Sequence, residues 1–407
     1  MPEKKKEEEE SMKIVDLKCA VIGDSPIIRL VTDEGIDGFS EIESSKPYMR
    51  PVVEMYRQFL LGEDPTDVER CMLKIRRFAG FKPWGSAVSA IEIALWDVAG
   101  KAAGLPVYKL LGGKVRDRVR VYNGGVRPEL RGHQPEDYAV AMAVMKAAPE
   151  GFTLIKEGVG YHGFMAPNIP GFSYGELRTG PRHPNRGMLT ERGLNHALAC
   201  VRAMKDVLGD EIGLALDMGP GWTVSDAIRI LQALEPLNIV WAEDLLTGDY
   251  VPWVHADQYR EVTRATSTPT HTGEQIYLRQ NFKDLVSSQA VRVIGPDPGD
   301  VGGIAELKWV AEYADLHGIQ IAPHGVLDGV FGLAALVQVC ATLPDNYIAF
   351  EYPVAKPDWW YSIVTGLPDR IVVDGFIDVW DRPGLGIEFD HEAASAHLRP
   401  EDKDFFS

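Results

Sequence analysis

Short apolar runs alternate with longer amphipathic stretches along most of the chain after residue 120. Three of the longer stretches repeat apolar residues every three to four positions, which predicts helices over 194–209, 225–235 and 303–318. The short runs have the length and character of buried parallel strands. There are eight of them: VRVYNGG, FTLIKEG, IGLALDMG, NIVWAEDL, TPTHTGEQ, AVRVIGPD, IQIAPHG and YIAFEYP.

The ends of the last six runs recur at regular intervals, at positions 217, 243, 274, 297, 324 and 351. This spacing is what a strand and its following helix need before the next parallel strand begins. Eight such units close naturally into a barrel, so the pattern predicts a (β/α)7β TIM-like barrel. A doubly wound open sheet is the alternative, although no Gly-x-Gly-x-x-Gly motif follows the first strands.

The first part of the chain has a different pattern. Strand-like runs separated by Asp-Glu-Gly and Asp-Gly turns predict antiparallel hairpins from Met12 to Ile42. The stretch SAVSAIEIALWDVAGKAAG then predicts a helix that Ser86 caps and Gly104 ends. Together these elements predict an α+β N-terminal domain.

These patterns divide the chain into four parts. We expect a disordered charged tail at 1–11, the α+β domain at 12–120 and the barrel at 121–356. The remaining segment, 357–407, is expected to return to the N-terminal domain. Within the barrel, 160–190 is rich in Gly and Pro, and a connection of this length is either functional or disordered.

Composition and charge narrow the class of protein. The 407 residues are 45% hydrophobic and 25% charged, which suits a globular protein of two domains. A formal net charge of −17 argues against nucleic acid and anionic membranes as partners and leaves a small molecule. No apolar run approaches the roughly 18 residues of a membrane span, and the charged start lacks the apolar part of a secretory signal. Four scattered cysteines without a Cys-x-x-Cys motif predict a cytoplasmic location.

Three successive predicted strands end in carboxylates, namely Asp217, Glu243 and Glu274. In a barrel these ends meet at one mouth, where three carboxylates repel one another unless a cation lies between them. Oxygen ligands without Cys or His favour Mg²⁺ over Zn²⁺. Asp244 follows directly, either as an alternative ligand or as a group behind the ligands. The alternative for each acid is a turn residue or a helix N-cap.

The next two strands end in Asp297 and His324. On adjacent strands the carboxylate would select the tautomer of the imidazole and raise its pKa, which makes a general base. A structural or exposed histidine is the alternative. Lys156 on the second strand and Glu351 on the last point to the same mouth, although Lys156 has a surface lysine as its alternative.

These motifs resemble the enolase superfamily, and within it the mandelate racemase subgroup. SAIEIALWDVAGKAAGLPVYKLLGG is similar to the helix of that family's capping domain, and LALDMG, VWAEDL and HTGEQ are similar to its three metal-ligand strand ends. GPDPGDVGGI and IAPHG are similar to its Asp-His pair. The resemblance covers nearly the whole chain and implies an N-terminal capping domain on a (β/α)7β-barrel, with an even-numbered homo-oligomer.

The resemblance also implies roles for the site residues. One Mg²⁺ per subunit, held by Asp217, Glu243 and Glu274, would coordinate a substrate carboxylate and stabilise an enediolate. His324 would be the acid/base and Asp297 its orienting partner. Lys156 would neutralise the carboxylate oxygen, and Glu351 would hydrogen-bond the carboxylate or enolate from the far side.

Two departures from the family pattern favour one reaction. Gly158 stands where the family often places a second basic lysine, and Met218-Gly219 offers no polar side chain beyond Asp217. A racemase needs a base on each face of the α-carbon, whereas a dehydratase can use His324 alone. The leading hypothesis is an acid-sugar (aldonate or aldarate) dehydratase that forms a 2-keto-3-deoxy acid. The alternatives are a racemase, epimerase or cycloisomerase on a hydroxy acid, lactone or amino-acid derivative, and a non-catalytic ligand-binding barrel.

Two loops are candidates for contacts with the substrate. In the 160–190 loop, Tyr161 is the leading catalytic candidate, with a rim-packing aromatic as its alternative; the other candidates are His162, Tyr174, Arg178, Arg182 and His183. In the cap, two loops contain polar or aromatic residues suited to hydroxyl groups or a distal carboxylate, with surface turns as the alternative. These predicted substrate-binding residues are Ser44, Lys46, Tyr48 and Trp84.

Overall fold

The computed structural model describes residues 11–78, 82–127, 130, 132–175, 188–246, 254–325, 329–354, 356–357 and 359–407. The predicted charged tail therefore lies, up to residue 10, outside the described residues, as do Arg178, Arg182 and His183. Within the described ranges, none of the helices combines the length and apolar character needed to cross a lipid bilayer.

The N-terminal strands form the antiparallel hairpins that the sequence predicts. They pair in the order β1-β2-β3, and three main helices pack with them around a separate buried core. The elements are β1 (Ile14–Ile22), β2 (Ser25–Thr32), β3 (Gly38–Glu41), α1 (Arg50–Leu60), α2 (Val68–Ile75) and α3 (Lys82–Ala103), followed by the short α4 (Val107–Leu110). We call this unit the cap.

The start of α3 differs from the prediction. The helix already begins at Lys82, so the expected N-cap residue Ser86 lies inside it. The hydroxyl group of Ser86 instead donates a hydrogen bond to Asp300 of the barrel, an interaction that the local sequence does not reveal. The predicted end is correct, because α3 ends at Ala103 and Gly104 takes the positive φ that favours glycine.

The eight predicted parallel strands form the barrel. Six pair in the order β10-β9-β8-β7-β6-β5, and β11 pairs in parallel with β4. Asn123 bridges β4 and β5, since its side chain accepts from the Lys156 backbone N–H and donates to the Lys156 carbonyl, both at 2.8 Å. The strands are β4 (Arg118–Gly124), β5 (Leu154–Gly158), β6 (Gly213–Asp217), β7 (Ala242–Glu243), β8 (Thr270–Thr272), β9 (Val293–Ile294), β10 (Gln320–Ile321) and β11 (Phe350–Pro353).

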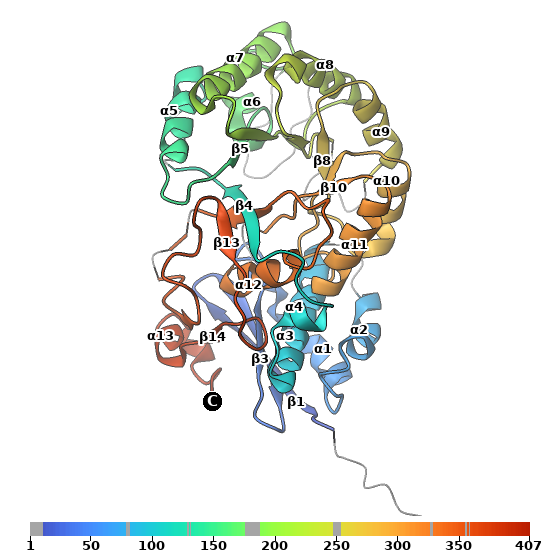
Figure 1. Ribbon diagram of the computed structural model, residues 1–407, viewed down its shortest axis with the longest axis vertical. Coiled ribbons are helices and arrows are strands. Elements are labelled where there is room, and N and C mark those ends of the chain that lie inside the picture. Colours follow the sequence, from blue (N-terminus) through green and yellow to red (C-terminus); the bar gives the residue numbers. More distant parts are fainter. Residues whose placement is uncertain are drawn as a thin grey trace, which may run out of the picture.

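Helices surround the strands, and the predicted amphipathic stretches all lie among them (Figure 1). The inside of the barrel is filled by a small apolar cluster that includes Tyr122 and Trp241. The mixed α/β architecture of a cap on a parallel barrel is therefore confirmed. The barrel helices are α5 (Pro135–Lys146), α6 (Met165–Asn168), α7 (Glu191–Leu208), α8 (Val224–Leu234), α9 (Ala256–Arg264), α10 (Lys283–Ser287), α11 (Ile304–Leu316) and α12 (Gly329–Cys340).

The last segment runs from the barrel to the cap (Figure 1). Asp402 accepts a hydrogen bond from the Val21 backbone N–H at 2.9 Å and pairs with Arg50 at 2.6 Å. Phe389 packs edge-on against Phe39 of the cap, with ring centroids 5.1 Å apart. The elements of this last segment are β12 (Val364–Thr365), β13 (Phe376–Asp378), β14 (Glu388–Phe389) and α13 (His391–Ser395).

Two buried cap carboxylates fix the cap on the carboxyl end of the barrel. Glu92 of α3 accepts hydrogen bonds from the backbone N–H groups of Ile304 at 2.7 Å and Ala305 at 2.9 Å, at the start of α11. Glu41 at the end of β3 accepts one from the Phe331 N–H at 3.0 Å, in the first turn of α12. The start of a helix favours a carboxylate because its N–H groups lack partners within the helix. These helices follow the strands that lead to Asp297 and His324.

Burial makes both carboxylates sensitive to pH. It raises the pKa of Glu92 to about 7 and that of Glu41 to about 8, even though the helix N–H groups act in the opposite direction. In the unfolded chain the same groups titrate near about 4.3. Between these values the folded protein binds more protons than the unfolded chain, so the free energy of unfolding decreases as pH rises.

We predict that Glu92→Gln weakens the pH dependence of stability. The contribution of Glu92 is fully present below about pH 4.3 and is lost as pH rises through about 7. The neutral amide keeps an acceptor oxygen but does not titrate. Urea unfolding at pH 5, 6 and 7 should therefore show a smaller fall in the free energy of unfolding than in the wild type, by up to about 1.4 kcal/mol per pH unit. Parallel pH profiles for the two proteins would contradict the assignment.

Candidate active site

Lys156 lies at the centre of the barrel mouth. Its Nζ atom is 2.7 Å from Glu243 Oε1, 3.1 Å from Glu351 Oε1 and 3.7 Å from Asp217 Oδ2. The side chain is buried, so the alternative of a surface lysine is wrong. Burial opposes the charged form, but Glu243 and Glu351 outweigh it and hold the pKa of Lys156 well above its usual value. Lys156 is therefore a permanent positive charge among the carboxylates.

His324 and Asp297 form the adjacent pair that the sequence predicts. Nδ1 of His324 lies 2.5 Å from Asp297 Oδ2, and the other oxygen of Asp297 accepts from the Gly299 N–H at 2.7 Å. The carboxylate is thus fixed, and it directs Nε2 of His324 towards Glu274 Oε2 at 3.4 Å and Glu351 Oε2 at 3.5 Å. Burial opposes protonation, but Glu274, Glu351 and Asp297 outweigh it and raise the pKa of His324 well above its usual value.

The three predicted metal ligands lie around Lys156 and His324. Asp217 and Glu243 are the last residues of β6 and β7 and stand opposite each other in the parallel register, while Glu274 follows β8 by two residues. Burial raises the pKa of Asp217 well above its usual value, with Glu243 adding to the effect. Burial acts in the same direction on Glu243, but Lys156 and His271 outweigh it and lower that pKa to about 2.

The donor set suits a hard divalent cation. Around the mouth, the Lys156 ammonium and the His324 imidazole face a larger number of carboxyl groups, and among the described residues Glu351 Oε2 is buried without a hydrogen-bond partner. Such a surplus of buried carboxylates is stabilised by a bound cation. Asp244 adds to this surplus, because burial and Glu274 raise its pKa well above the usual value while Thr272 donates to it at 2.5 Å. The carboxyl groups concerned are Asp217, Glu243, Asp244, Glu274 and Glu351.

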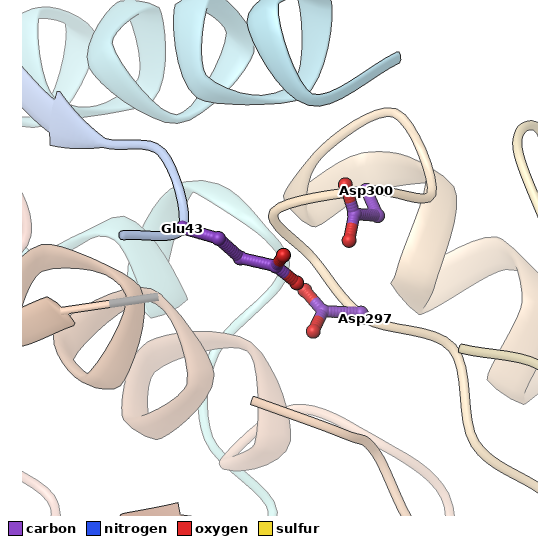
Figure 2. A group of neighbouring side chains, drawn as sticks. All are labelled: Glu43, Asp297 and Asp300. Atoms are coloured by element: carbon purple, nitrogen blue, oxygen red, sulfur yellow. The ribbon is translucent and has the colours of Figure 1, made fainter. Parts of the chain in front are cut away.

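A second acidic group lies beside Asp297 (Figure 2). Oxygen atoms of Glu43, Asp297 and Asp300 all lie within 4.8 Å of one another, and this is the one such group of three in the part of the chain that the structure describes. The predicted metal ligands Asp217, Glu243 and Glu274 do not form such a group, so their oxygen atoms are not all within 4.8 Å of one another. In the second group, however, the Lys46 ammonium lies 2.8 Å from both Glu43 and Asp300. A positive charge is therefore already built into it.

The predicted cap residues have different environments. Lys46 is buried, and its ammonium group is engaged by Glu43, Asp300 and Ser86, the last at 3.0 Å. Ser44 is half-buried. Tyr48 and Trp84 are 55% and 51% exposed, which leaves their rings accessible to a ligand. Their roles towards a substrate remain predictions.

The loop after β5 brings His162, rather than Tyr161, to Asp217, one of the predicted metal ligands. The Tyr161 hydroxyl lies 3.0 Å from Ser173 Oγ, and its ring packs edge-on against Trp222 with centroids 5.1 Å apart. His162 Nδ1 lies 3.2 Å from Asp217 Oδ1. A Cβ atom at Gly158 would come within 2.8 Å of the His162 ring, so the imidazole occupies the space that a side chain at 158 would need. Tyr174, the other described candidate in this loop, is 66% exposed.

Two residues that the sequence reasoning missed support Glu243. Trp241 donates from Nε1 to Glu243 Oε2 at 2.9 Å, and His271 Nδ1 lies 3.5 Å from the same oxygen. Trp241 precedes Glu243 by two residues and lies just before β7, and alternation along the predicted strand NIVWAEDL already places both on the same face. His271 stands opposite Glu243 in the register of β7 and β8, a pairing that the sequence alone does not supply.

Comparison with known proteins identifies the family. Residues 21–112 match the mandelate racemase / muconate lactonizing enzyme N-terminal domain, and residues 139–394 match the enolase C-terminal domain-like family. A D-xylonate dehydratase of Haloferax volcanii is 32% identical over 394 residues, which cover 95% of this chain and 89% of that protein. A D-galactonate dehydratase of Variovorax paradoxus is 30% identical over 377 residues, covering 90% and 88%.

Solved structures agree with this relationship. A mandelate racemase/muconate lactonizing enzyme-like protein from Rubrobacter xylanophilus has a TM-score of 0.80 and 31% identity, with 96% of this chain and 98% of that chain covered. A mandelate racemase/muconate lactonizing enzyme from a Sulfitobacter species has a TM-score of 0.79 and 28% identity, covering 95% and 96%. The chain therefore belongs to the mandelate racemase / muconate lactonizing enzyme family of the enolase superfamily.

Proposed function

We propose that the protein is a Mg²⁺-dependent dehydratase of sugar acids, which converts an aldonate or aldarate into a 2-keto-3-deoxy acid. The observation that carries the proposal is the buried Asp297–His324 pair, whose free imidazole edge faces the Glu274 and Glu351 carboxylates beside Lys156. The names of the two relatives, a D-xylonate and a D-galactonate dehydratase, support the same reaction class. A small carboxylate is the substrate that this charge arrangement fits.

In this proposal Asp217, Glu243 and Glu274 hold one Mg²⁺ per subunit. The bound ion would act as a Lewis acid that makes the proton next to the substrate carboxylate easier to remove. Lys156 neutralises an oxygen of that carboxylate, because it is charged and buried at the centre of the mouth. With a proton on its carboxyl group, Glu351 would donate a hydrogen bond to the substrate carboxylate or the enolate. Its Oε2 atom has no hydrogen-bond partner among the described residues.

His324 removes the α-proton through Nε2, since Nδ1 is held by Asp297. The C–H electron pair moves into the substrate and gives an enediolate, and Asp297 stabilises the imidazolium that forms. The electron pair then forms the double bond between the α- and β-carbons while the β-hydroxyl leaves. His324 returns its proton to that hydroxyl, so water is released and the enol product tautomerises to the 2-keto acid.

His162 is placed to assist the departing hydroxyl. It reaches over Gly158 from the loop after β5 and contacts Asp217. Desolvation and the nearby Lys156 ammonium lower the pKa of His162, although half of its side chain remains exposed. In the tautomer with its proton on Nε2, the neutral ring can donate one hydrogen bond to the oxygen that leaves.

The position of the His162 ring over Gly158 also supports the second candidate, a racemase or epimerase. An imidazole over Gly158 would act on the α-carbon from a position other than that of His324. The geometry supports the non-catalytic barrel less, because an oriented, buried Asp–His pair has no purpose in simple ligand binding. The cytoplasmic location and the even-numbered homo-oligomer remain predictions.

Turnover is the first test. With Mg²⁺ and a panel of aldonates and aldarates, the wild type should release a 2-keto-3-deoxy acid, measured by a colour reaction for 2-keto acids. His324→Asn should lower kcat by about 10²- to 10⁴-fold, because the base is removed. His317→Asn is the control and should leave kcat unchanged, because this half-buried histidine follows α11 and packs on Tyr313. No turnover by the wild type on any member of the panel would count against the proposal, and α-proton exchange in D₂O without loss of water would favour the second candidate.

The role of His162 is tested separately. In His162→Asn we expect dehydration to slow by roughly 10-fold or more, while exchange of the α-proton with D₂O persists, because His324 still removes it. Tyr161→Phe is the matched control, since that hydroxyl faces Ser173. A substrate with fluoride in place of the β-hydroxyl should reduce the difference between His162→Asn and wild type. An equal loss of exchange and dehydration would instead make His162 a group for binding or for removal of the α-proton.

Metal binding distinguishes the two acidic groups. Calorimetric titration of the chelator-treated protein with Mg²⁺ should show one ion per subunit, and Glu274→Gln should weaken that binding by about 10-fold or more, since a charged ligand is lost. Glu43→Gln is the control from the second acidic group and should leave the affinity for Mg²⁺ within about twofold, because Lys46 neutralises that group. Loss of binding in Glu43→Gln alone would move the metal to the second group.

A further inference from the structure

Four side chains from the cap and the barrel meet beside the Asp297–His324 pair. Glu43 and Lys46 come from the cap loop after β3, Ser86 comes from α3, and Asp300 comes from the loop after β9. Lys46 Nζ lies 2.8 Å from Glu43 Oε2, 2.8 and 3.0 Å from the two oxygens of Asp300, and 3.0 Å from Ser86 Oγ. Figure 2 shows Glu43 reaching from the cap towards both aspartates. We call Glu43, Lys46, Ser86 and Asp300 the cap bridge.

The cap bridge is held together by the charge of Lys46. Asp300 is fully buried, and Glu43 and Lys46 are nearly so. Buried like charges repel strongly because little solvent screens them. Oxygen atoms of Glu43, Asp297 and Asp300 lie within 4.8 Å of one another. The Lys46 ammonium lies between Glu43 and Asp300 and offsets their repulsion. Without it, the cap loop and the loop after β9 would separate.

Asp300 connects the cap bridge to Asp297 and, through it, to the proposed base His324. The Asp300 N–H donates to the Asp297 carbonyl at 3.1 Å, and the Val301 N–H donates to the same carbonyl at 2.7 Å, so Asp297 and Asp300 share one tight turn. The Asp297 carboxylate in turn holds His324 at 2.5 Å. A shift of Asp300 would therefore shift the group that sets the orientation of His324, and small errors in that orientation reduce the rate greatly.

The cap touches this region at further points. The Gly302 N–H donates to Ser89 of α3 at 2.9 Å, and Glu92 accepts from the N–H groups of Ile304 and Ala305. The end of the loop after β9 and the start of α11 are thus anchored to α3, and Lys46 adds a contact from the cap loop to Asp300. The sequence predicts a substrate contact for Lys46, and the structure shows its contacts with Glu43, Ser86 and Asp300.

We propose that Lys46 is a positioning residue that couples docking of the cap to the alignment of the Asp297–His324 pair. Its ammonium group acts through Asp300 and does not itself recognise the substrate. The inference deepens the proposed function and rests on it for its kinetic consequences. The cap thereby has two roles: it encloses the substrate, and it orients the base.

A charge-compensated pair of substitutions tests this. Lys46→Met removes the ammonium and Asp300→Asn removes a facing carboxylate, so the double variant K46M/D300N has fewer unbalanced charges than K46M alone. We expect K46M to lower kcat by about 10- to 100-fold with KM within about threefold of wild type. The double variant should recover most of the kcat that K46M loses. Lys283→Met on the exposed start of α10 is the control for loss of a lysine.

A direct contact between Lys46 and the substrate gives the opposite pattern. KM would then rise in K46M and stay raised in the double variant, since Asp300→Asn cannot replace a cation that binds substrate. That result would overturn the proposal, as would an unchanged kcat in K46M.

Thermal unfolding separates failure of this inference from failure of the proposed function. Tm should fall in K46M and recover in K46M/D300N, whether or not any sugar acid is turned over. A wild type without turnover, together with this recovery of Tm, would reject the dehydratase and retain the cap bridge. Equal Tm values for K46M and the double variant would reject the cap bridge itself.

Discussion

The balance of charge around Lys156 is the constraint on which the site depends. The buried Lys156 ammonium lies among the carboxylates at the barrel mouth. Together with His271 it lowers the pKa of Glu243 to about 2, whereas burial raises the pKa of Asp217. Such a site is unfavourable without cations, because desolvated carboxylates repel one another. The charge of Lys156 and the imidazole of His324 offset part of this repulsion, and the proposed Mg²⁺ would offset more of it. The same balance prepares the site for an anionic substrate.

The cap is part of this arrangement rather than a separate lid. Two of its glutamates hold the first turns of α11 and α12, the helices that follow the strands leading to Asp297 and His324. Lys46 joins the same region through Asp300. The N–H groups at a helix start attract carboxylates. Glu92 and Glu41 therefore bind the cap to the two helices that follow Asp297 and His324. Docking of the cap and geometry of the base are therefore physically linked.

Much of this protein follows from local pattern. The period of apolar residues reveals the strands and helices, and the regular interval between strand ends indicates a barrel. Because parallel strands end on one side, Lys156, Glu243 and His324 had to lie near one mouth. Trp241 could have been assigned to the same place from its distance of two residues from Glu243. These features depend on residues close in sequence and on a repeat that leaves few alternatives.

The partners of the charged groups depend on contacts between distant segments. Ser86 looks like a helix cap in the sequence, but its hydroxyl group binds Asp300, more than two hundred residues later. Lys46 has the chemistry of a substrate ligand, yet it is buried between Glu43 and Asp300. Tyr161 and His162 are neighbours with similar prospects in the sequence, and the backbone after β5 turns only His162 towards Asp217. Residue type limits what a side chain can bind, whereas the three-dimensional packing of the chain selects which partner lies within reach.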